Sequence, residues 1–472
     1  NSALDTDLGS EQFKAEYTLT GSEPEGVLDF VIDALDYMGN PGSYNLTTDG
    51  SQVTYDKTPP ELTYVNISSN NADTSWAKVS DSIIIAFTSS EAISLDSLAL
   101  IPAISILGQM ASVSDLQNNK FSAVYVPTDS DAEGEATFEI QFSDLAGNDG
   151  VPVTVSTNNT KVIFDKTPPA DFTVGLLTPT GGNQVADFWN LTNTGMDIIV
   201  PVANDTTLKN GTVQLYGKVG SNNFEVLGNI STILPIEINA DKTISIAGDL
   251  IEGLTGFAEG QTIYIKAIMN DRPGNSKEGS QSITEILIDE TPATITPISI
   301  ISNNNNSSLA KVGDSVTVSF STSESLIDTV VKIEDQLAIV SGLGSNQFIG
   351  VYEMGEANTE GIVPFEVSFI DFQGNPFTIS DSTTDASQVI FDKTKPTLDP
   401  VTITSDNSCS AGAIAKAENI VTINFTSLEP LLSTFSIVMS DTVSVIDLGS
   451  SQYKIDHQLS AEDVEGDMTF LI

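Results

Sequence analysis

Apolar and polar residues alternate with a period of two in several short stretches of the chain. One set of stretches has its apolar positions at Ile83, Ile85 and Phe87; Val316, Val318 and Phe320; and Val421, Ile423 and Phe425. A second set has them at Phe30, Ile32 and Ala34; Phe138, Ile140 and Phe142; Ile265, Ala267 and Met269; and Phe365, Val367 and Phe369. Successive side chains of a strand point to opposite faces, so this period predicts strands with one buried face. The sequence therefore predicts an all-β chain.

Two short motifs recur in phase with these predicted strands. Asp-x-x-Gly-Asn follows each member of the second set, at residues 36–40, 144–148, 271–275 and 371–375. A second motif, Asp-Lys/Glu-Thr with a proline close behind, starts at Asp56, Asp165, Asp289 and Asp392, with spacings of 109, 124 and 103 residues. Gly and Asn favour turns, and a spacing of about 100 residues matches one immunoglobulin-like sandwich.

The repeats divide the chain into five predicted domains. These are 1–58, the last part of one repeat; 59–167, a whole repeat; 168–291, a longer and divergent repeat; 292–394, a whole repeat; and 395–472, the first part of another. Residues 8–14 resemble residues 448–454, so we expect both ends of the sequence to lie within a longer polypeptide.

Charge and rare residues limit the possible chemistry. The chain has 64 acidic and 18 basic residues, a net charge of −46, which disfavours nucleic acid and favours hard cations. It has one cysteine and one histidine, which excludes an internal disulfide and any catalytic triad that needs histidine. The notable acids recur with the repeat, whereas an active site would occur once. We therefore expect no enzyme, and no apolar run is long enough for membrane insertion.

The repeated elements resemble bacterial immunoglobulin-like (Big-type) tandem repeats of large extracellular adhesin or surface-filament proteins. The likeness lies in the strand-then-Glu segments 88–91 and 322–324, the Glu-Gly-strand-turn segments 133–148 and 360–375, and the Asp-Lys-Thr-Pro linkers. The resemblance implies tandem immunoglobulin-like β-sandwich domains in an elongated array, located extracellularly or at a cell surface and often dependent on calcium.

The strand order of such a sandwich predicts where the recurrent acids meet. The linker, the loop after the second strand and the turn before the last strand all lie at the N-terminal pole of a repeat. Three carboxylates at one place need a counter-ion, and Ca²⁺ takes six to eight oxygen ligands. The predicted metal ligands are Asp56, Glu91, Asp144, Asn148, Asp165, Asp271, Asn275, Asp289, Glu324, Asp371, Asn375, Asp392 and Glu429.

A simpler interpretation of the same residues stays open. Asp-x-x-Gly-Asn can be a turn in which Asp caps backbone N–H groups, without any metal. The divergent repeat also has Asn204 and Asp205 where the others have Glu. Asn66, Asn190 and Asn424 head Asn-x-Ser/Thr motifs and are candidate glycosylation positions.

Two functions compete for such an array. One is the rod or stalk of a cell-surface adhesin, in which neighbouring repeats of the same chain contact each other and calcium stiffens the junctions. The other is the building block of a self-assembling extracellular filament, sheath or surface layer, in which identical chains are the partners. Exposed edge strands would favour the second, because an edge can accept a strand from a neighbour.

Overall fold

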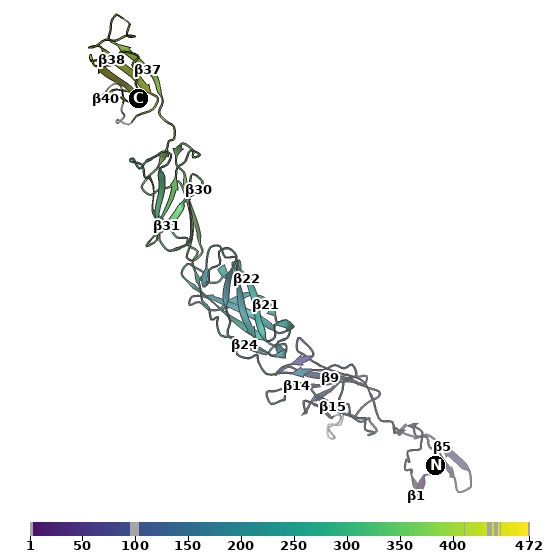
Figure 1. Cartoon of the computed structure of the whole chain (residues 1–472). Coiled ribbons are helices and arrows are strands. Elements are labelled where there is room, and N and C mark those ends of the chain that lie inside the picture. The colour runs from purple at the N-terminus through teal and green to yellow at the C-terminus, as the bar shows by residue number, and fades with distance from the viewer. Residues whose placement is uncertain are drawn as a thin grey trace. The chain divides into compact units, whose positions relative to one another are not determined.

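The computed structural model describes residues 3–94, 103–409, 411–431, 437–438, 442–443 and 445–470 (Figure 1). It separates into two compact units. The first runs to Thr291 and includes Gln373–Asn375, and the second comprises Pro292–Phe372 and the chain from Pro376 onward.

Residues 59–167 fold as two facing sheets. The first sheet has the order β12-β13-β9-β7, and the second has the order β11-β10-β15. A third, short sheet places β16 between β14 and β8. The bounds are β7 (Leu62–Ser69), β8 (Trp76–Ala77), β9 (Ile83–Ser89), β10 (Ala103–Ile106), β11 (Gln109–Met110), β12 (Ser112–Asp115), β13 (Lys120–Tyr125), β14 (Gly134–Glu135), β15 (Phe138–Gln141) and β16 (Ile163–Phe164). This division of strands between two sheets is that of an immunoglobulin-like sandwich.

Residues 168–291 have longer strands in the same arrangement. One sheet has the order β17-β19-β22, and the other has the order β18-β25-β23-β20-β21, with β24 beside β23. The bounds are β17 (Leu177–Thr180), β18 (Phe188–Trp189), β19 (Gly195–Val202), η1 (Thr206–Leu208), β20 (Thr212–Val219), β21 (Glu225–Thr232), η2 (Pro235–Glu237), β22 (Ala240–Ala247), α1 (Gly248–Glu252), β23 (Thr262–Asn270), β24 (Ser276–Glu278) and β25 (Ile286–Ile288).

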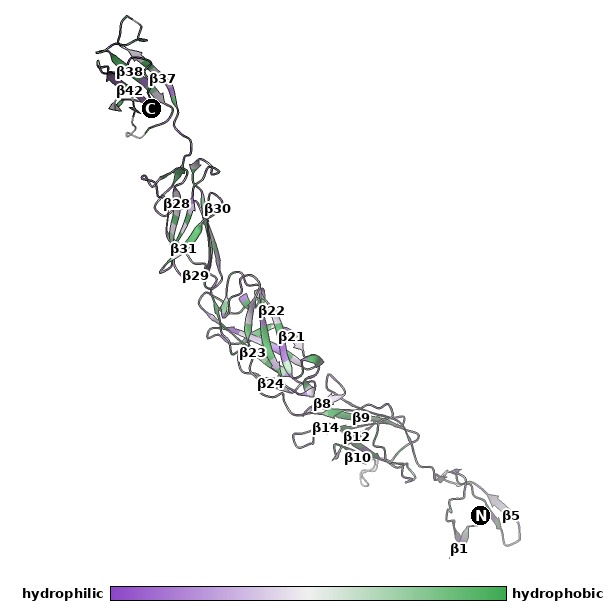
Figure 2. Ribbon diagram, in the orientation of Figure 1, coloured by the Kyte–Doolittle hydropathy of each residue, from purple (hydrophilic) through white to green (hydrophobic). Residues whose placement is uncertain are grey.

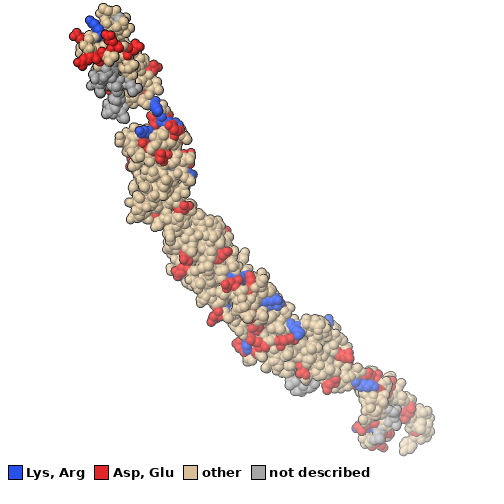
Figure 3. Space-filling model, viewed as in Figure 1, with Lys and Arg blue, Asp and Glu red and all other residues tan. Residues whose placement is uncertain are grey.

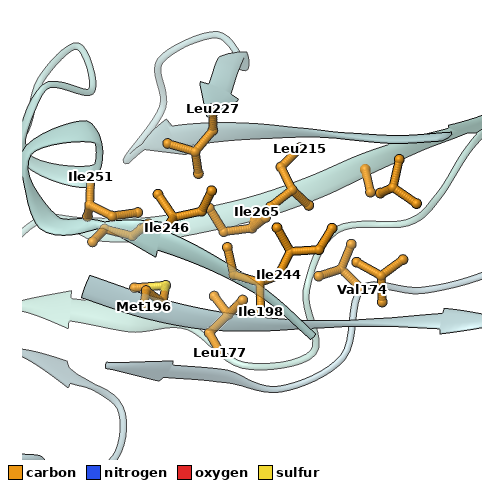
Figure 4. Packing of buried hydrophobic residues seen from close by; sticks show 14 of the residues in the cluster. Val174, Leu177, Met196, Ile198, Leu215, Leu227, Ile244, Ile246, Ile251 and Ile265 are labelled. Atoms are coloured by element: carbon orange, nitrogen blue, oxygen red, sulfur yellow. The ribbon is translucent and has the colours of Figure 1, made fainter. Parts of the chain in front are cut away.

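The core of this repeat lies between its two sheets. Figure 4 shows Leu177 and Ile198 of one sheet facing Leu215 and Ile265 of the other. Each of these side chains is at most 2% exposed. Burial of apolar area at roughly 25 cal/mol per Å² is the main stabilising contribution of such an interface.

The second unit contains two further groups of sheets. In residues 292–394 the orders are β26-β28-β32-β31, β30-β29-β34-β35 and β27-β36-β33, and after residue 394 they are β37-β38-β42-β41 and β39-β40. The bounds are β26 (Ile295–Ser302), β27 (Leu309–Ala310), β28 (Ser315–Thr322), β29 (Leu326–Ile333), β30 (Gln336–Leu337), β31 (Ile339–Gly344), β32 (Gln347–Glu353), β33 (Gly361–Ile362), β34 (Phe365–Asp371), β35 (Pro376–Ser380), β36 (Ile390–Phe391), β37 (Leu398–Ser405), β38 (Ile420–Ser427), β39 (Ile437–Val438), β40 (Thr442–Val443), β41 (Val445–Gly449) and β42 (Gln452–Gln458).

Residues 3–58 form three two-stranded ladders, β1-β2, β3-β6 and β4-β5. The bounds are β1 (Leu4–Gly9), β2 (Gln12–Glu16), β3 (Gly26–Val27), β4 (Ile32–Leu35), β5 (Pro41–Tyr44) and β6 (Thr54–Tyr55). The burial predicted for Phe30, Ile32 and Ala34 is wrong here, since Phe30 is 39% and Ile32 55% exposed. The physical reason is that β4 pairs only with β5, and no second sheet covers this face among the described residues.

Elsewhere the predicted alternation is confirmed. Ile83, Ile85 and Phe87 are at most 1% exposed, and the residues between them are half-buried. In Figure 2 the strand labelled β9 is green, because Ile84 and Ala86 are hydrophobic as well, so its period of two lies in the burial of its side chains. The buried clusters of residues 65–164, 174–288, 293–391 and 421–459 each lie inside one predicted repeat. The chain is therefore an all-β series of immunoglobulin-like sandwiches, whereas the individual domain boundaries stay predictions.

Candidate cation site at the repeat junctions

Each Asp-x-x-Gly-Asn motif forms a turn, called here the FG turn, after the penultimate long strand of its repeat. In residues 144–148 the Asp144 carboxylate accepts hydrogen bonds from the backbone N–H of Asn148 at 2.8 Å and from its Nδ2 at 2.7 Å. Gly147 has a φ of +93°, a conformation in which a side chain would be strained. The interpretation of this motif as a turn capped by Asp is therefore confirmed.

The FG turn also holds the linker that enters its repeat. Asn148 donates from Nδ2 to the backbone carbonyl of Asp56 at 3.2 Å. Asn275 does the same to Asp165 at 3.0 Å, and Asn375 to Asp289 at 3.1 Å. These amide groups are thus hydrogen-bond donors to the linker. As metal ligands, Asn148, Asn275 and Asn375 stay predictions, and the Oδ1 of Asn375 already accepts from the N–H of Leu191.

A second set of hydrogen bonds fixes the linker to the repeat before it. The Glu133 carboxylate accepts from the N–H of Lys166 at 2.9 Å and from the hydroxyl of Thr167 at 2.6 Å. The ammonium of Lys166 donates to the carbonyls of Asp129 and Asp131. The Thr167 hydroxyl and the Lys166 N–H hold the pKa of Glu133 below its usual range.

The same anchor recurs at two other linkers. Lys57 with Glu25, and Lys393 with Glu360, repeat these bonds. The Asp of the Asp-Lys-Thr motif was a predicted functional residue, whereas this role of the Lys was not predicted from the sequence. The signal that could have found it is the Glu-Gly motif that lies about thirty residues before each such linker.

The structure brings three of the predicted ligands together at the first junction, where the linker that starts at Asp56 enters the repeat of residues 59–167. Asp56 of the linker, Glu91 after β9 and Asp144 of the FG turn have carboxylate oxygens within 4.8 Å of one another. Burial, together with the negative charges of Asp56 and Asp144, raises the pKa of Glu91. Burial also acts to raise the pKa of Asp144, but the hydrogen bonds from Asn148 outweigh it and the net shift is downward. In the part of the chain that the structure describes, this is the one group of three such residues.

The acidic residues are arranged differently at the second junction, where the linker that starts at Asp165 enters the repeat of residues 168–291. Asp165 is 6% exposed, and its Oδ2 is buried without a hydrogen-bond partner. Burial, reinforced by the charges of Asp271 and Glu133, raises the pKa of Asp165 to about 6. Asp205, which stands near the position of Glu91, accepts from the N–H and hydroxyl of Thr207. A cation here would neutralise Asp165, but three carboxylates are not gathered as they are at the first junction.

The remaining predicted ligands are divided between the two compact units. Asp289 belongs to the first unit and holds Asn375, while Asp371 accepts from the N–H of Ala293 in the second unit. Glu324 follows β28. The carboxylate of Asp392 accepts from the N–H of Thr394, and the N–H of Glu429 bonds to Ser427. Metal binding at these positions stays a prediction.

The surface carries charge of mostly one sign. On the face drawn in Figure 3, acidic residues are scattered over the repeats with few basic residues between them. No helix in the described ranges is long and apolar enough to cross a membrane.

The three candidate glycosylation positions differ in access. The Nδ2 of Asn190 is buried and donates to the carbonyls of Asn183 and Gln373, so the folded chain leaves no room for a glycan on it. Asn66 and Asn424 are half-buried and stay predictions.

No family model and no curated protein sequence matches the chain. Solved structures that it resembles include one from a 1.5-MDa bacterial ice-binding adhesin, 12% identical over 72% of this chain and 100% of that one, with a TM-score of 0.35. A Ca²⁺-stabilised, ice-binding adhesin of an Antarctic bacterium is 14% identical over 84% and 91%, with a TM-score of 0.41. A tetra-tandem repeat from the extending region of a large adhesion protein is 16% identical over 86% and 93%, with a TM-score of 0.25. Likeness at this level does not extend to function.

Proposed function

We propose that the chain is a rod or stalk region of an extracellular, cell-surface adhesin, and that calcium stiffens the junctions between its repeats. The observation that supports this most is the gathering of Asp56, Glu91 and Asp144 at the first junction. They come from the linker, the loop after β9 and the FG turn, so a shared ion would join three separate segments. The proposed role is mechanical, and the proposal includes no enzymatic activity.

The donor set fits a hard cation. Carboxylate oxygens are the usual protein ligands of Ca²⁺, which also accepts backbone carbonyls and water. Asp56, Glu91 and Asp144 would hold the ion. When bound, calcium would supply positive charge to a cluster in which burial, and then the charges of Asp56 and Asp144, raise the pKa of Glu91. The chain contributes the placement of these acids, because the Asn148 bonds to Asp144 and to the linker fix both of them.

Hydrogen bonds attach the linker at the first junction to both of its neighbouring repeats. The linker is anchored to the preceding repeat through Lys57 and Glu25 and to the following repeat through Asn148. A cation that joins Asp56 to Glu91 and Asp144 would add a second attachment to the following repeat. Bending about residues 56–60 would then require breaking ligand bonds, and such a chain would act as a spacer.

The test compares the 472-residue protein in millimolar calcium and in chelator. Small-angle scattering and melting curves are the measurements. A ligand at 100 times its Kd stabilises the state it binds by about 2.7 kcal/mol, so we expect calcium to raise the first melting transition and to narrow the distribution of particle lengths. Glu91→Gln should remove much of this response. Glu61→Gln makes the same chemical change at an exposed position outside the cluster and should leave the response intact.

The proposal would be rejected by a wild-type protein whose melting and scattering are the same in calcium and in chelator. It would also be rejected if Glu61→Gln and Glu91→Gln weakened the response equally, because calcium would then act through general screening of the acidic surface. Equilibrium dialysis with radioactive calcium gives the number of ions bound at each concentration.

A self-assembling filament or surface layer is the second candidate, and one strand favours it. β21 lies at the end of its sheet and spans eight residues. It exposes Val226 by 62% and Ile230 by 64%. A long edge strand with exposed apolar side chains can pair with the edge of another chain. Sedimentation velocity of wild type and Ile230→Lys tests this: larger species that Ile230→Lys abolishes would favour assembly, whereas monomers at all concentrations would exclude it.

The remaining parts of the proposal concern partners and surroundings. Neighbouring repeats are the first partners, through the linker contacts described above. Glycans at Asn66 or Asn424 belong to the proposal as well, and intact-mass measurement of protein from its natural source would detect them. The acidic surface favours neither nucleic acid nor anionic membranes as partners.

A further inference from the structure

The FG turn of residues 271–275 contacts a loop of the preceding repeat that the cation hypothesis does not involve. This loop, residues 70–82, joins β7 to β9 and is called here the AB loop. Asn71 donates from Nδ2 to the carbonyl of Pro273 at 2.8 Å. Lys78 donates from Nζ to the carbonyl of Gly274 at 3.0 Å. Both turn residues and both loop residues lie in the first compact unit.

An ion pair and an aromatic contact add to these hydrogen bonds. The Nε of Arg272 lies 2.7 Å from Oδ2 of Asp73. The same guanidinium lies over the ring of Trp76, 5.4 Å from its centre. Arg272 and Asp73 are each about one-third exposed. Exposed ion pairs contribute little by themselves, but stacking on Trp76 restricts the guanidinium and adds a cation–π attraction.

The AB loop is held by hydrogen bonds of its own that do not involve Arg272. Asp81 accepts from Nδ2 of Asn71 and from the N–H of Lys78, both at 2.8 Å. Asp73 accepts from the N–H and hydroxyl of Ser75. The side chains that meet the turn are therefore held by bonds within their own repeat. Burial acts to raise the pKa of Asp73, but the bonds from Ser75 and Arg272 outweigh it and lower that pKa.

A second FG turn makes equivalent contacts with different donors. The carbonyls of Gln373 and Gly374 accept from Asn190 at 2.8 Å and from Asn183 at 2.9 Å. These residues lie in the loop between β17 and β19, the AB loop of residues 181–194, and all of them belong to the first unit. The two receiving loops thus bind the same two carbonyls of the turn, at its third and fourth positions. The loop of residues 70–82 adds the ion pair with Asp73 and the contact with Trp76.

We propose that the AB loop of residues 70–82 is a docking site for the FG turn of residues 271–275, and that Arg272 holds these two repeats together without any bound cation. The turn supplies two backbone carbonyls and one positive charge. The loop supplies two donors, one carboxylate and one aromatic face. This inference does not rest on the calcium proposal, because none of the side chains that make these contacts is a predicted metal ligand.

The test measures the distance between the two repeats in the full 472-residue chain. Cys409→Ser removes the native thiol, and nitroxide labels are attached to Ser114→Cys and Thr243→Cys, two exposed positions on different repeats. Pulsed electron paramagnetic resonance then gives the distance distribution in calcium and in chelator. We expect one narrow distribution in both solutions for the otherwise unchanged protein. Arg272→Ala should broaden it in both.

Charge reversal separates docking from a loss of folding. Arg272→Asp should broaden the distribution, and Asp73→Arg combined with Arg272→Asp should narrow it again. Lys277→Ala removes an ion pair with Asp171 inside the 168–291 repeat and should leave the distribution unchanged. If chelator alone broadens the wild-type distribution as much as Arg272→Ala does, a cation holds the junction and the inference is wrong. An unchanged distribution in Arg272→Ala would overturn it as well.

Tryptophan quenching gives an independent measurement. The chain has two tryptophans, of which Trp189 is 0% exposed and Trp76 is half-buried beneath Arg272. Arg272→Ala should raise the acrylamide quenching constant of the Trp76 component by about two-fold, because the guanidinium no longer covers the ring. The Trp189 component should stay constant and reports that the repeat is folded. If calcium has no effect on the chain but Arg272→Ala still broadens the distribution, the proposed function fails and the docking site stands.

Discussion

The FG turns that begin at Asp144 and Asp271 have the same local hydrogen bonds, but the pKa values of these two aspartates shift in opposite directions. Asp144 accepts from the N–H and Nδ2 of Asn148 at 2.8 and 2.7 Å, and Asp271 accepts from those of Asn275 at 2.7 and 2.9 Å. Burial acts to raise the pKa of both. The hydrogen bonds outweigh burial at Asp144, whose pKa falls, whereas burial prevails at Asp271, whose pKa rises.

The motif therefore determines the structure of the turn, whereas the packing around the turn determines the direction in which the pKa of its aspartate shifts. Near Asp271, the charge of Asp205 adds to the effect of burial. At the first junction the raised pKa belongs instead to Glu91, which is surrounded by two further acids. A cation shared by three carboxylates suits the first junction. At the second, Arg272 adds docking contacts that need no ion.

The largest effect on stability is expected from neutralising Asp144 and Asp271, one at a time. Asp144→Asn should destabilise the segment around β15 by roughly 2–4 kcal/mol, because two donors of Asn148 lose a charged acceptor in a buried site. Asp271→Asn should cost less, since neutralisation also removes a charge that burial disfavours. Hydrogen exchange of residues 138–153 and 265–280 measures each local free energy without assuming that the whole chain unfolds in one step.

Asp36→Asn is the matched control for this pair. Asp36 makes the same bonds to Asn40 in an exposed turn. Its replacement should leave the exchange of residues 138–153 and 265–280 unchanged. Equal losses at Asp144 and Asp271 would show that their different pKa directions have no energetic consequence.

The second prediction concerns pH at the second junction. The pKa of Asp165 is raised to about 6 from 3.8, so in the folded chain this group takes up a proton at a higher pH than it does when unfolded. The folded state then binds more protons between these values, and the free energy of unfolding rises as pH falls from 7 toward 5. We expect a gain on the order of 1–2 kcal/mol in chelator from this group.

Asp165→Asn provides the reference for that pH dependence. Its Oδ1 can still accept from the N–H of Thr167, as the Asp165 carboxylate does at 3.0 Å. The variant should be more stable than wild type at pH 7 in chelator, and the difference should shrink toward pH 5. Hydrogen exchange of residues 162–168 across this range is the measurement. A difference that grows as pH falls would contradict the raised pKa.

The strands and turns were predictable from sequence because their causes are local. Alternation at Ile83, Ile85 and Phe87 identified the buried face of β9, and the Gly and Asn of the FG turn identified a reversal of the chain. The convergence of Asp56, Glu91 and Asp144 was also predictable. It follows from the order of strands in the sandwich and needs only the identity of the fold.

The ionisation and docking of these residues were not predictable in the same way. Asp165 and Asp56 occupy the same place in the motif, but only Asp165 has a buried oxygen without a partner, which depends on packing between repeats. The contacts of Arg272 require Asp73 and Trp76, about 200 residues earlier in the sequence. Ile32 is exposed although it lies in a stretch with a period of two. This period predicts which face of a strand is apolar, but it does not predict whether a second sheet covers that face.

A smaller effect is expected from the linker anchor that the first and second junctions share. Lys166→Met keeps the length of the side chain and removes the two bonds from Nζ to the carbonyls of Asp129 and Asp131. We expect a loss of about 1 kcal/mol, seen as faster hydrogen exchange in residues 127–135. Lys161→Met removes only an exposed ion pair with Glu135 and should change exchange by less than about 0.5 kcal/mol. Equal effects of the two variants would argue against the anchor.

The smallest expected effect is a gain, at the linker after residues 168–291. Glu290 stands where other linkers have Lys57, Lys166 and Lys393, and its N–H still bonds to Glu259. Burial, together with the charges of Glu252 and Glu259, raises the pKa of Glu290. Glu290→Lys should stabilise this repeat by about 0.5–1 kcal/mol, because it replaces repulsion by attraction and restores the anchoring donor. Glu290→Gln, which only removes the charge, should give part of that gain. Urea unfolding, followed by the emission of buried Trp189, measures the stability of both variants. If Glu290→Lys is no more stable than Glu290→Gln, the anchor depends on the loop before the linker rather than on the lysine.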